Sequence, residues 1–593
     1  MKIRDGFQTF ILFGFAIVTS FLYAQKQPVP SAPAYVVERD VVVPMRDGIK
    51  LRADILRPRG NAKVPVLVYR TPYGKEPAQK DYTTFVHAVE RGYTVVIQDV
   101  RGRYASAGVF RPYQSEGADG YDTIEWAARQ PWSNGKVGTF GLSYPGAVQW
   151  LAAVENPPHL KAMVPAMTFS TARNFFYAGG TWDMSWIQWI WDNIAPDVRS
   201  KRNLPGPKTP AEARAAWEKT GERMLNELPL SGLAEMRAIA PYYYEWLSHP
   251  PNDPWWDWSE LRNKYSRVHA AVLNLSGWYD DNYGPEGATT NFAGLLKARA
   301  GQNSADTHLL IGPWVHGVDN TEKNKSGERE FARSAAINYD AVVLRWLDHY
   351  LRDVDNGVDR EPPVRYFVMG ADEWREGTAW PPMNQPSPFF LQNPDTSQNR
   401  GLLQSEKPQN PESYTDFISD PESPVINPYA SSGAHDYQQL VTLADVLTFD
   451  SAPLVEDTEV TGNIHGRVFV SCDCQDLDVW FRLLDVAPNG TAFNLMNPGL
   501  DVERASYRDP DRQQLLVHGQ IYEIDLPNLI TSNLFKKGHR IRIQISGSFF
   551  PNFSRNLQTG KSEATSAEMR KATIRIYHDR EHPSQVLIPI VKR

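Results

Sequence analysis

Hydrophobic and polar residues follow two different periods in the first half of the chain. β-Branched runs at 64–70 and 93–100 are typical of strands, whereas the run at 82–92 has apolar residues at helical spacing and ends on a glycine. A helical pattern at 120–130 and a strand pattern at 136–141 continue the series. Strands that alternate with helices predict an α/β fold, with a parallel sheet that helices cover on both faces.

This alternation stops near residue 170 and resumes near residue 270. The stretch 166–266 is typical of helices and loops, and it holds nine of the eighteen tryptophans. Strand patterns return at 270–281 and 307–317, and a long amphipathic helix is predicted at 332–354. We therefore interpret 166–266 as a helical cap inserted into the α/β part.

The pattern changes again after residue 385. Prolines and glycines separate short alternating strands, which predicts an all-β sandwich. The predicted organisation is a signal peptide at 1–24, an α/β core at 25–165 and 267–385, a helical cap at 166–266 and a β-sandwich at 386–593.

The first residues indicate export. Lys2 and Arg4 precede an apolar run from Phe10 to Tyr23, and Ala24 offers a small residue at a cleavage point, as in a secretory signal peptide. The alternative is an uncleaved membrane anchor, but the run is short for a full span. We expect a periplasmic or secreted protein with no membrane attachment after signal cleavage.

Composition narrows the function classes. The chain has 593 residues, a formal net charge of −7 and no block of lysine and arginine, so nucleic-acid binding is not expected. Only two cysteines occur, Cys472 and Cys474, and no further ligands lie at metal-binding spacing beside them. A local disulfide and two free thiols both remain open, and so does a homo-oligomer.

A serine lies at the junction of a predicted strand and a predicted helix. Gly141 precedes Ser143 by two residues and Gly146 follows it by three. A sharp turn with small residues on either side can lift a nucleophilic serine above a sheet edge. The second glycine comes one residue later than in the common motif, where Pro145 stands, and proline fits the first turn of a helix. The alternative is a serine that caps the helix.

A serine hydroxyl needs a base and an acid that follow later strands in this fold. Asp280 and Asp281 come just beyond the apolar residues of the strand pattern at 270–281, and Asp280 is preferred because it is nearer the strand. His316 comes directly after the next strand, whereas the other histidines fall before the serine or the acid, at the wrong edge, inside a helix or in the β region. The alternative for His316 is an ordinary loop histidine.

Two groups are candidates to stabilise an oxyanion. The backbone N–H of Tyr144 directly follows the serine. Tyr73 follows the strand at 64–70, so its hydroxyl is expected at the same sheet edge. Simple packing is the alternative role for Tyr73.

Several motifs occur in the order found in one enzyme family. They are RTPYGK, QDVRGRYASAG, GTFGLSYPG, SGWYDDNY, IGPWVHG and FVMGADEWRE, with ISGSFFPNFSRNLQTG and IYHDREHPS in the β region. The chain thereby resembles the family of bacterial cocaine esterases, glutaryl cephalosporin acylases, α-amino acid ester hydrolases and X-Pro dipeptidyl-peptidases. The resemblance covers nearly all of the predicted mature chain.

The resemblance implies an α/β-hydrolase core, a helical cap and a jelly-roll-like C-terminal domain. It assigns Ser143 as nucleophile, His316 as base and Asp280 as acid, with Tyr73 and the N–H of Tyr144 as oxyanion donors. It implies no metal or organic cofactor, and no more than half of the cap tryptophans are expected to line the acyl pocket.

One departure from the family bears on the substrate. The α-amino acid ester hydrolases are expected to hold an ammonium group with a carboxylate cluster just after the acid, but here Asp281, Asn282 and Tyr283 follow. The prediction is therefore a serine hydrolase that cleaves ester or amide bonds of small acyl compounds. An X-Pro dipeptidyl-peptidase or α-amino acid ester hydrolase is the alternative enzyme, and a glycan-binding protein the alternative from another class.

Overall fold

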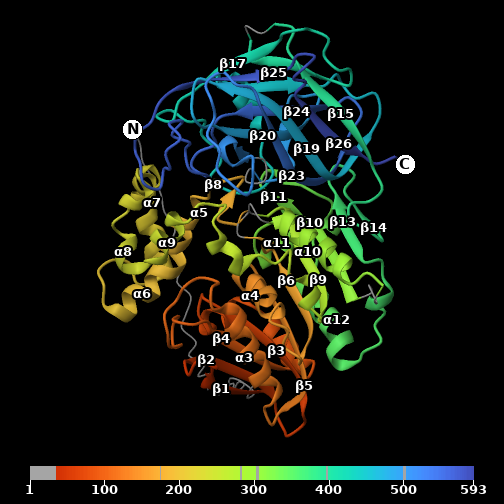
Figure 1. Ribbon diagram of the computed structural model, residues 1–593. Coiled ribbons are helices and arrows are strands. Elements are labelled where there is room, and N and C mark those ends of the chain that lie inside the picture. The colour runs from red at the N-terminus through yellow and green to blue at the C-terminus, as the bar shows by residue number, and fades with distance from the viewer. Residues whose placement is uncertain are drawn as a thin grey trace, which may run out of the picture. The chain divides into compact units, whose positions relative to one another are not determined.

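Ten strands between residues 35 and 377 pair into one mixed sheet (Figure 1). Their order is β1-β2-β4-β3-β5-β6-β9-β10-β13-β14. Neighbours from β4 to β13 run parallel, and antiparallel pairs form both edges. The strands are β1 Tyr35–Pro44, β2 Lys50–Pro58, β3 Val64–Thr71, β4 Thr94–Asp99, β5 Ser133–Leu142, β6 Leu160–Ala166, β9 Ala271–Tyr279, β10 Thr307–Val315, β13 Val364–Val368 and β14 Glu373–Gly377.

The computed structural model describes residues 35–592, except 172, 174, 281–283, 302–305, 396–397 and 498–501. The predicted signal peptide at 1–24 lies outside the described residues. Within the described residues, no helix combines the length and the apolar character that crossing a membrane requires.

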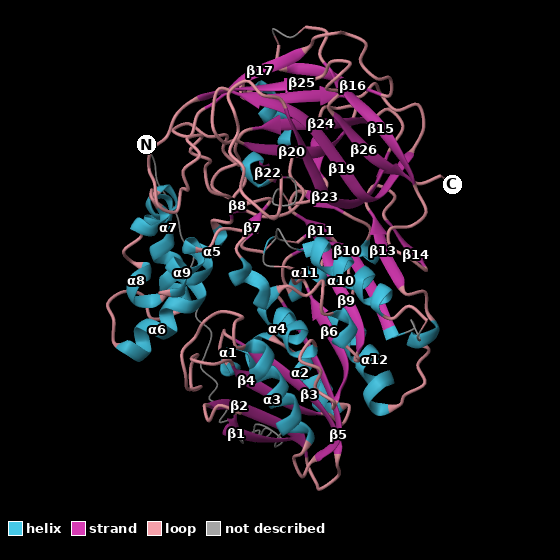
Figure 2. Ribbon diagram, viewed as in Figure 1, coloured by secondary structure: helices cyan, strands magenta, loops and turns pink. Residues whose placement is uncertain are grey.

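Helices cover both faces of the sheet because its central strands are apolar on both sides (Figure 2). In β3, Val66 and Val68 pack into the cluster that contains α3 and α4, whereas Leu67 and Tyr69 pack into the cluster that contains α2 and α12. The helices are α2 Thr84–Glu90, α3 Glu116–Ala128, α4 Tyr144–Ala153 and α12 Tyr339–Arg352. The parallel sheet predicted from alternation is confirmed.

Helix α12 is shorter than the helix predicted at 332–354. The side chain of Asn338 accepts a hydrogen bond from the N–H of Ala341 at 2.7 Å, so Asn338 caps the helix and Tyr339 begins it. At the other end, Asp353 adopts a left-handed backbone with φ 58° and ends the helix. Both ends are set by single residues that the apolar pattern does not reveal.

Helices separated by loops lie between β6 and β9, and most of these helices are short. They are α5 Ser185–Trp189, a π-helical turn at Ile190–Ile194, α6 Ala195–Arg202, α7 Pro210–Asn226, α8 Met236–Ile239 and α9 Tyr242–Ser248. Five of the nine tryptophans of this region are buried: Trp182, Trp186, Trp191, Trp246 and Trp256. The helices are thus held mainly by aromatic packing, which compensates for their short length.

The C-terminal part is rich in strands and forms a second, twelve-stranded sheet (Figure 2). Its pairs are antiparallel apart from β16 with β18, and the long strand β19 pairs with β23, β25 and β26. The strands are β15 Gln385–Gln392, β16 Arg400–Gln404, β17 Tyr414–Ser419, β18 Val446–Asp450, β19 Thr458–Cys472, β20 Asp478–Val486, β21 Ala492–Asn494, β22 Val502–Arg504, β23 Tyr522–Phe535, β24 Arg540–Ser546, β25 Ala572–Tyr577 and β26 Gln585–Ile590.

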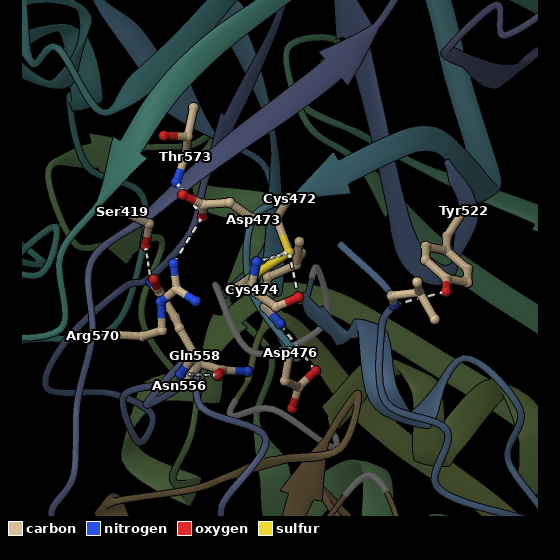
Figure 3. Close-up of a disulfide and its surroundings, with 12 residues drawn as sticks. Ser419, Cys472, Asp473, Cys474, Asp476, Tyr522, Asn556, Gln558, Arg570 and Thr573 are labelled. Atoms are coloured by element: carbon tan, nitrogen blue, oxygen red, sulfur yellow. Dashed lines mark hydrogen bonds and ion pairs between the residues drawn. A yellow bond between two sulfur atoms is a disulfide. The ribbon is translucent and has the colours of Figure 1, made fainter. Parts of the chain in front are cut away.

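The two cysteines form a disulfide in this part (Figure 3). It joins Cys472, the last residue of β19, to Cys474, with an S–S distance of 2.05 Å. The carboxylate of Asp473 between them accepts a hydrogen bond from the N–H of Thr573 at 3.0 Å and lies 3.5 Å from the guanidinium of Arg570. The sequence left disulfide and free thiols open, and the structure contains the disulfide.

Candidate active site

Ser143 lies on a tight turn between β5 and α4, at the edge where the parallel strands end. Its backbone has φ 69° and ψ −128°, a combination that non-glycine residues rarely adopt and that stores strain. The N–H of Ser143 donates a hydrogen bond to the carbonyl oxygen of Ala166 in β6 at 3.0 Å. The turn is thereby held against the neighbouring strand with the serine at its tip.

The two glycines explain how α4 approaches the sheet so closely. A Cβ atom on Gly146 would overlap the carbonyl oxygen of Ala166. Gly141 has φ 140°, and a Cβ atom there would lie 2.6 Å from the Cβ of Pro145. The late position of the second glycine thus matches the point where helix and strand touch, and Pro145 occupies the first turn of α4 without disturbing it.

His316 and Asp280 come together because β9 and β10 are parallel neighbours. The Nδ1 of His316 lies 2.5 Å from Oδ1 of Asp280, whose side chain is fully buried. The hydroxyl of Ser276 lies 3.3 Å from Oδ2 of Asp280. The predicted preference for Asp280 agrees with this geometry, and the alternative, Asp281, lies outside the described residues.

Asn497, in the loop after β21, holds the backbone beside the carboxylate. Its side-chain amide donates hydrogen bonds to the carbonyl oxygens of Tyr279 at 2.5 Å and Asp280 at 2.6 Å. Asn497 is buried and comes from the C-terminal part of the chain. Sequence reasoning missed it because no periodicity or motif connects residues that are more than 200 positions apart.

Tyr73 and Ser143 line the same cavity. The indole N–H of Trp189 donates a hydrogen bond to the Tyr73 oxygen at 3.1 Å. Burial raises the pKa of Tyr73, although its polar contacts with Trp189 and Ser143 act in the opposite direction. Since Trp189 supplies a donor, the phenolic proton of Tyr73 is available for another oxygen.

Tyr144 begins helix α4 and is fixed at its other end. Its N–H lies in the first turn, where a backbone N–H has no acceptor within the helix. Its buried hydroxyl donates a hydrogen bond to Oε1 of Glu116 at 2.9 Å and accepts one from the N–H of Tyr113 at 3.0 Å. Glu116 in turn pairs with Arg70 at 2.8 Å. This network locks the start of α4.

Ser143, His316 and Tyr73 line one cavity of about 470 Å³. Two of the nine cap tryptophans, Trp186 and Trp189, are among the described residues that line it, and the other seven are not. The remaining lining residues are Tyr82, Tyr113, Leu142, Ser185, Gln188, Asp192, Asn193, Gly317 and Val318. The cavity is therefore aromatic on its cap side, as expected from the tryptophan content.

Arg103 connects the Tyr73 loop to the cap. Its fully buried guanidinium donates hydrogen bonds to three backbone carbonyls: Pro72 at 2.8 Å, Ile194 at 3.1 Å and Asn193 at 3.0 Å. It also pairs with Asp197 at 3.2 Å. The motif around Arg103 predicts no role for this residue from the sequence, because the atoms that accept its hydrogen bonds are backbone carbonyls of other segments.

The sheet order, the serine on its strained turn after β5, and the aspartate and histidine after the parallel strands β9 and β10 define an α/β hydrolase. The predicted α/β-hydrolase core and the strand-rich C-terminal part are confirmed. The chain belongs to the X-Pro dipeptidyl-peptidase (S15) family: residues 47–318 match that family, and residues 356–587 match the X-Pro dipeptidyl-peptidase C-terminal non-catalytic domain. The resemblance inferred from the motifs is thereby confirmed.

Several known proteins are similar over almost their whole length. The cocaine esterase of Rhodococcus sp. (strain MB1 Bresler) is 33% identical over 94% of this chain and 99% of its own. An aminopeptidase structure from a marine sediment Thaumarchaeota archaeon has a TM-score of 0.77 at 24% identity, covering 97% of this chain and 99% of its own. An α-amino acid ester hydrolase structure has a TM-score of 0.73, also at 24% identity, covering 97% and 100%. The two structures show the shared fold.

Proposed function

We propose that the protein is a serine hydrolase that cleaves ester bonds, and by the same route amide bonds, of small acyl compounds. Ser143 is the nucleophile, His316 the general base and Asp280 the acid that orients the imidazole. The observation that carries the proposal is the contact between His316 and the fully buried Asp280 beside the cavity that holds Ser143. The similarity to a cocaine esterase supports ester substrates.

In the first half of the reaction, Oγ of Ser143 attacks the carbonyl carbon and its proton passes to Nε2 of His316. The Nδ1–H of His316 donates to Asp280, which stabilises the imidazolium. The oxyanion accepts hydrogen bonds from the hydroxyl of Tyr73 and the N–H of Tyr144. The tetrahedral intermediate collapses, the alcohol or amine leaves with the proton from His316, and the acyl group remains on Ser143.

In the second half, a water molecule attacks the acyl-enzyme. His316 takes one proton from the water and later returns it to Oγ of Ser143, while the same two donors hold the second oxyanion. The carboxylic acid leaves, and the free serine is regenerated. The side chains of Ser143, His316, Asp280 and Tyr73, with the N–H of Tyr144, account for each step.

A fluorophosphonate probe and a panel of p-nitrophenyl esters test the proposal. The wild-type protein should be labelled and should hydrolyse esters, because its serine is activated. Ser143→Ala should lose labelling and reduce kcat by about 10⁴-fold or more, since the nucleophile is gone. Ser185→Ala is the matched control, because Ser185 lines the same cavity. Labelling that persists in Ser143→Ala would exclude Ser143 as the nucleophile.

An X-Pro dipeptidyl-peptidase is the second candidate, because the matched family carries that description. Xaa-Pro p-nitroanilides distinguish the two activities. Strong turnover of these anilides with negligible cleavage of simple esters would favour the peptidase. Similarity to an α-amino acid ester hydrolase at 24% identity indicates fold alone.

We also propose that the C-terminal strands have a jelly-roll-like arrangement. We further propose that the protein is exported, with a signal peptide at 1–24. The basic start and the apolar run that follows support export. N-terminal sequencing of the mature protein from the periplasm or medium should begin at Gln25. An intact Met1 on a membrane fraction would contradict cleavage.

A further inference from the structure

Asp192 presents a buried, incompletely satisfied carboxylate to the catalytic cavity. Its side chain lies in the π-helical turn Ile190–Ile194 and lines the same cavity as Ser143 and His316. The residue is only 9% exposed. Oδ2 accepts a hydrogen bond from the amide of Gln188 at 3.3 Å, whereas no donor among the described residues reaches Oδ1.

An unsatisfied carboxylate oxygen is an unfavourable feature in an apolar wall. A buried acceptor without a donor costs roughly 1–3 kcal/mol, and more when it is charged. Burial also raises the pKa of Asp192, because removal from water disfavours the charged carboxylate. A buried acceptor of this kind in a native protein calls for an explanation, and at a catalytic cavity a donor group on the substrate can supply one.

The position of Asp192 on a π-helical turn supports a role in binding. Single π-helical turns interrupt an α-helix at an energetic cost and are frequent at functional sites. Here the turn follows α5 directly and continues into α6, so that Asp192 and Asn193 both face the cavity. The hydrogen bonds from Arg103 to the carbonyls of Asn193 and Ile194 hold the end of the turn in place.

The remaining lining of the cavity has the character of a cation site. Five aromatic side chains face it, and no lysine or arginine occurs among its described lining residues. The basic group whose charge acts on Asp192 is Arg214, but it forms no ion pair with Asp192 within the described part of the chain. The aromatic residues are Tyr73, Tyr82, Tyr113, Trp186 and Trp189.

We propose that the hydrolase prefers substrates that carry a cationic amine, and that Asp192 pairs with this cation while the ester carbonyl lies at Ser143. The inference rests on the proposed function and names the substrate class of the same site. Asp192 supplies the charge, and the surrounding aromatic faces add cation–π attraction. The like charge disfavours an anionic substrate, and a neutral one would leave the carboxylate unpaired.

Two matched pairs of esters test the preference on either side of the scissile bond. Butyrylcholine and 3,3-dimethylbutyl butyrate differ only in the charge of the alcohol part. p-Nitrophenyl 6-aminohexanoate and p-nitrophenyl heptanoate differ in the same way in the acyl part. For each pair, the measured quantity is the ratio of kcat/KM for the cationic ester to kcat/KM for the neutral ester.

Asp192→Asn should lower this ratio by about 10- to 100-fold for at least one pair, since a hydrogen bond or ion pair with a charged group is lost. The loss should lie mainly in KM of the cationic ester. Because the ratio compares two substrates on one variant, a general loss of folding or activity cancels. Ratios that change less than about fivefold for both pairs would overturn the proposal.

Asp340→Asn serves as the matched control. Asp340 is also a buried aspartate, but it lies on α12 and accepts a hydrogen bond from the hydroxyl of Thr83 at 2.8 Å, and it does not line the cavity. Both ratios should remain at the wild-type value in this variant. A fall as large as that of Asp192→Asn would show that loss of any buried carboxylate has the same effect, which contradicts a specific role.

A binding measurement separates this proposal from the catalytic one. Choline and its uncharged isostere 3,3-dimethylbutan-1-ol are titrated into the wild-type protein and Asp192→Asn while tryptophan fluorescence is followed, because Trp186 and Trp189 face the cavity. Choline should bind at least tenfold more weakly to the variant, and the alcohol should not. Equal choline affinity refutes the cation site even if esters are hydrolysed. If wild-type protein hydrolyses no ester, the catalytic proposal fails and the choline titration alone decides the cation site.

Discussion

The hydroxyl of Tyr73 is held in a geometry that favours donation. Trp189 donates to the Tyr73 oxygen, so the phenolic proton is available for donation to the oxyanion that forms at the serine. A tyrosine held only by packing would not need a polar contact at its hydroxyl. The two alternatives left open by the sequence can therefore be separated by removing one oxygen atom.

Tyr73→Phe should lower kcat for ester hydrolysis by about 10²–10³-fold with little change in KM, because one of two oxyanion donors is lost. Steady-state kinetics with a p-nitrophenyl ester measure this. Tyr82→Phe removes another phenol from the same cavity and should have a much smaller effect. An unchanged kcat in Tyr73→Phe would remove Tyr73 from the mechanism.

Other residues at this scale could not be found in the sequence. Ser143, His316 and Asp280 were predictable because each follows a strand whose type the apolar pattern reveals. Asp192 was not, since its significance depends on which donors fail to reach it. Likewise, Arg103 donates to backbone carbonyls, and because every residue has a carbonyl, the sequence does not show which ones accept.

At the scale of elements, the contact between α4 and β6 fixes the serine turn. Gly146 lies where the helix backbone meets the carbonyl of Ala166, and the N–H of Ser143 donates to that same carbonyl. One strand carbonyl therefore sets both the distance of the helix and the position of the nucleophile. Any atom inserted between them should affect stability and activity together.

Gly146→Ala should destabilise the protein by about 1–3 kcal/mol and reduce kcat, because its Cβ must displace α4 from the strand. Calorimetry and ester kinetics on the same preparation measure both effects. The control is Gly377→Ala at the end of β14, where the nearest atom to a new Cβ would be 3.7 Å away. Equal stability of the two variants would contradict the role of close packing.

Sequence patterns predicted elements better than their ends. The run 332–354 is apolar at helical spacing throughout, yet the helix spans only Tyr339–Arg352. Capping at Asn338 and the left-handed backbone of Asp353 decide the ends, and both depend on local geometry that a periodic pattern averages out.

At the scale of the whole molecule, buried ionisable groups make stability depend on pH. His578 is buried, with ring nitrogens 2.9 Å from the hydroxyls of Ser413 and Thr415, and burial lowers its pKa to about 4. Burial raises the pKa of Asp99 and of Asp476 to about 6, which acts in the opposite direction on acidification. The wild-type curve alone therefore does not isolate the histidine.

His578 is neutral in the folded state and titrates near its ordinary value when unfolded. Its contribution to stability is present above about pH 6.5 and is lost as the pH falls toward 4, because the unfolded chain binds the proton first. The loss should be on the order of 2–3 kcal/mol. In His578→Gln, the fall in melting temperature between pH 6.5 and 4 should be smaller than in wild type.

His518→Gln is the control, because His518 lies exposed in a loop of the same C-terminal part. Its melting temperatures should follow the wild-type pH dependence. Parallel curves for wild type and His578→Gln would show that the imidazole carries none of the dependence.

The sequence pattern predicted only part of how the chain is divided between the two large sheets. The change of texture after residue 385 revealed a strand-rich part, and the domain boundaries at 165, 266 and 385 remain predictions. The pattern of apolar and turn residues could not predict that Asn497, from the C-terminal part, contacts the backbone at the end of β9, because such contacts depend on the tertiary arrangement.

The contact between Asn497 and the backbone of Asp280 has a consequence for truncated and recombined genes. Its amide binds the backbone of the catalytic acid, although it belongs to a region whose family counterpart is called non-catalytic. A gene fragment that ends before this asparagine would still encode every reacting side chain. The backbone at Tyr279 and Asp280 would, however, lack the two hydrogen bonds that Asn497 donates. Recombination that exchanges the carboxyl-terminal half between relatives should therefore alter turnover, even where no reacting residue is exchanged.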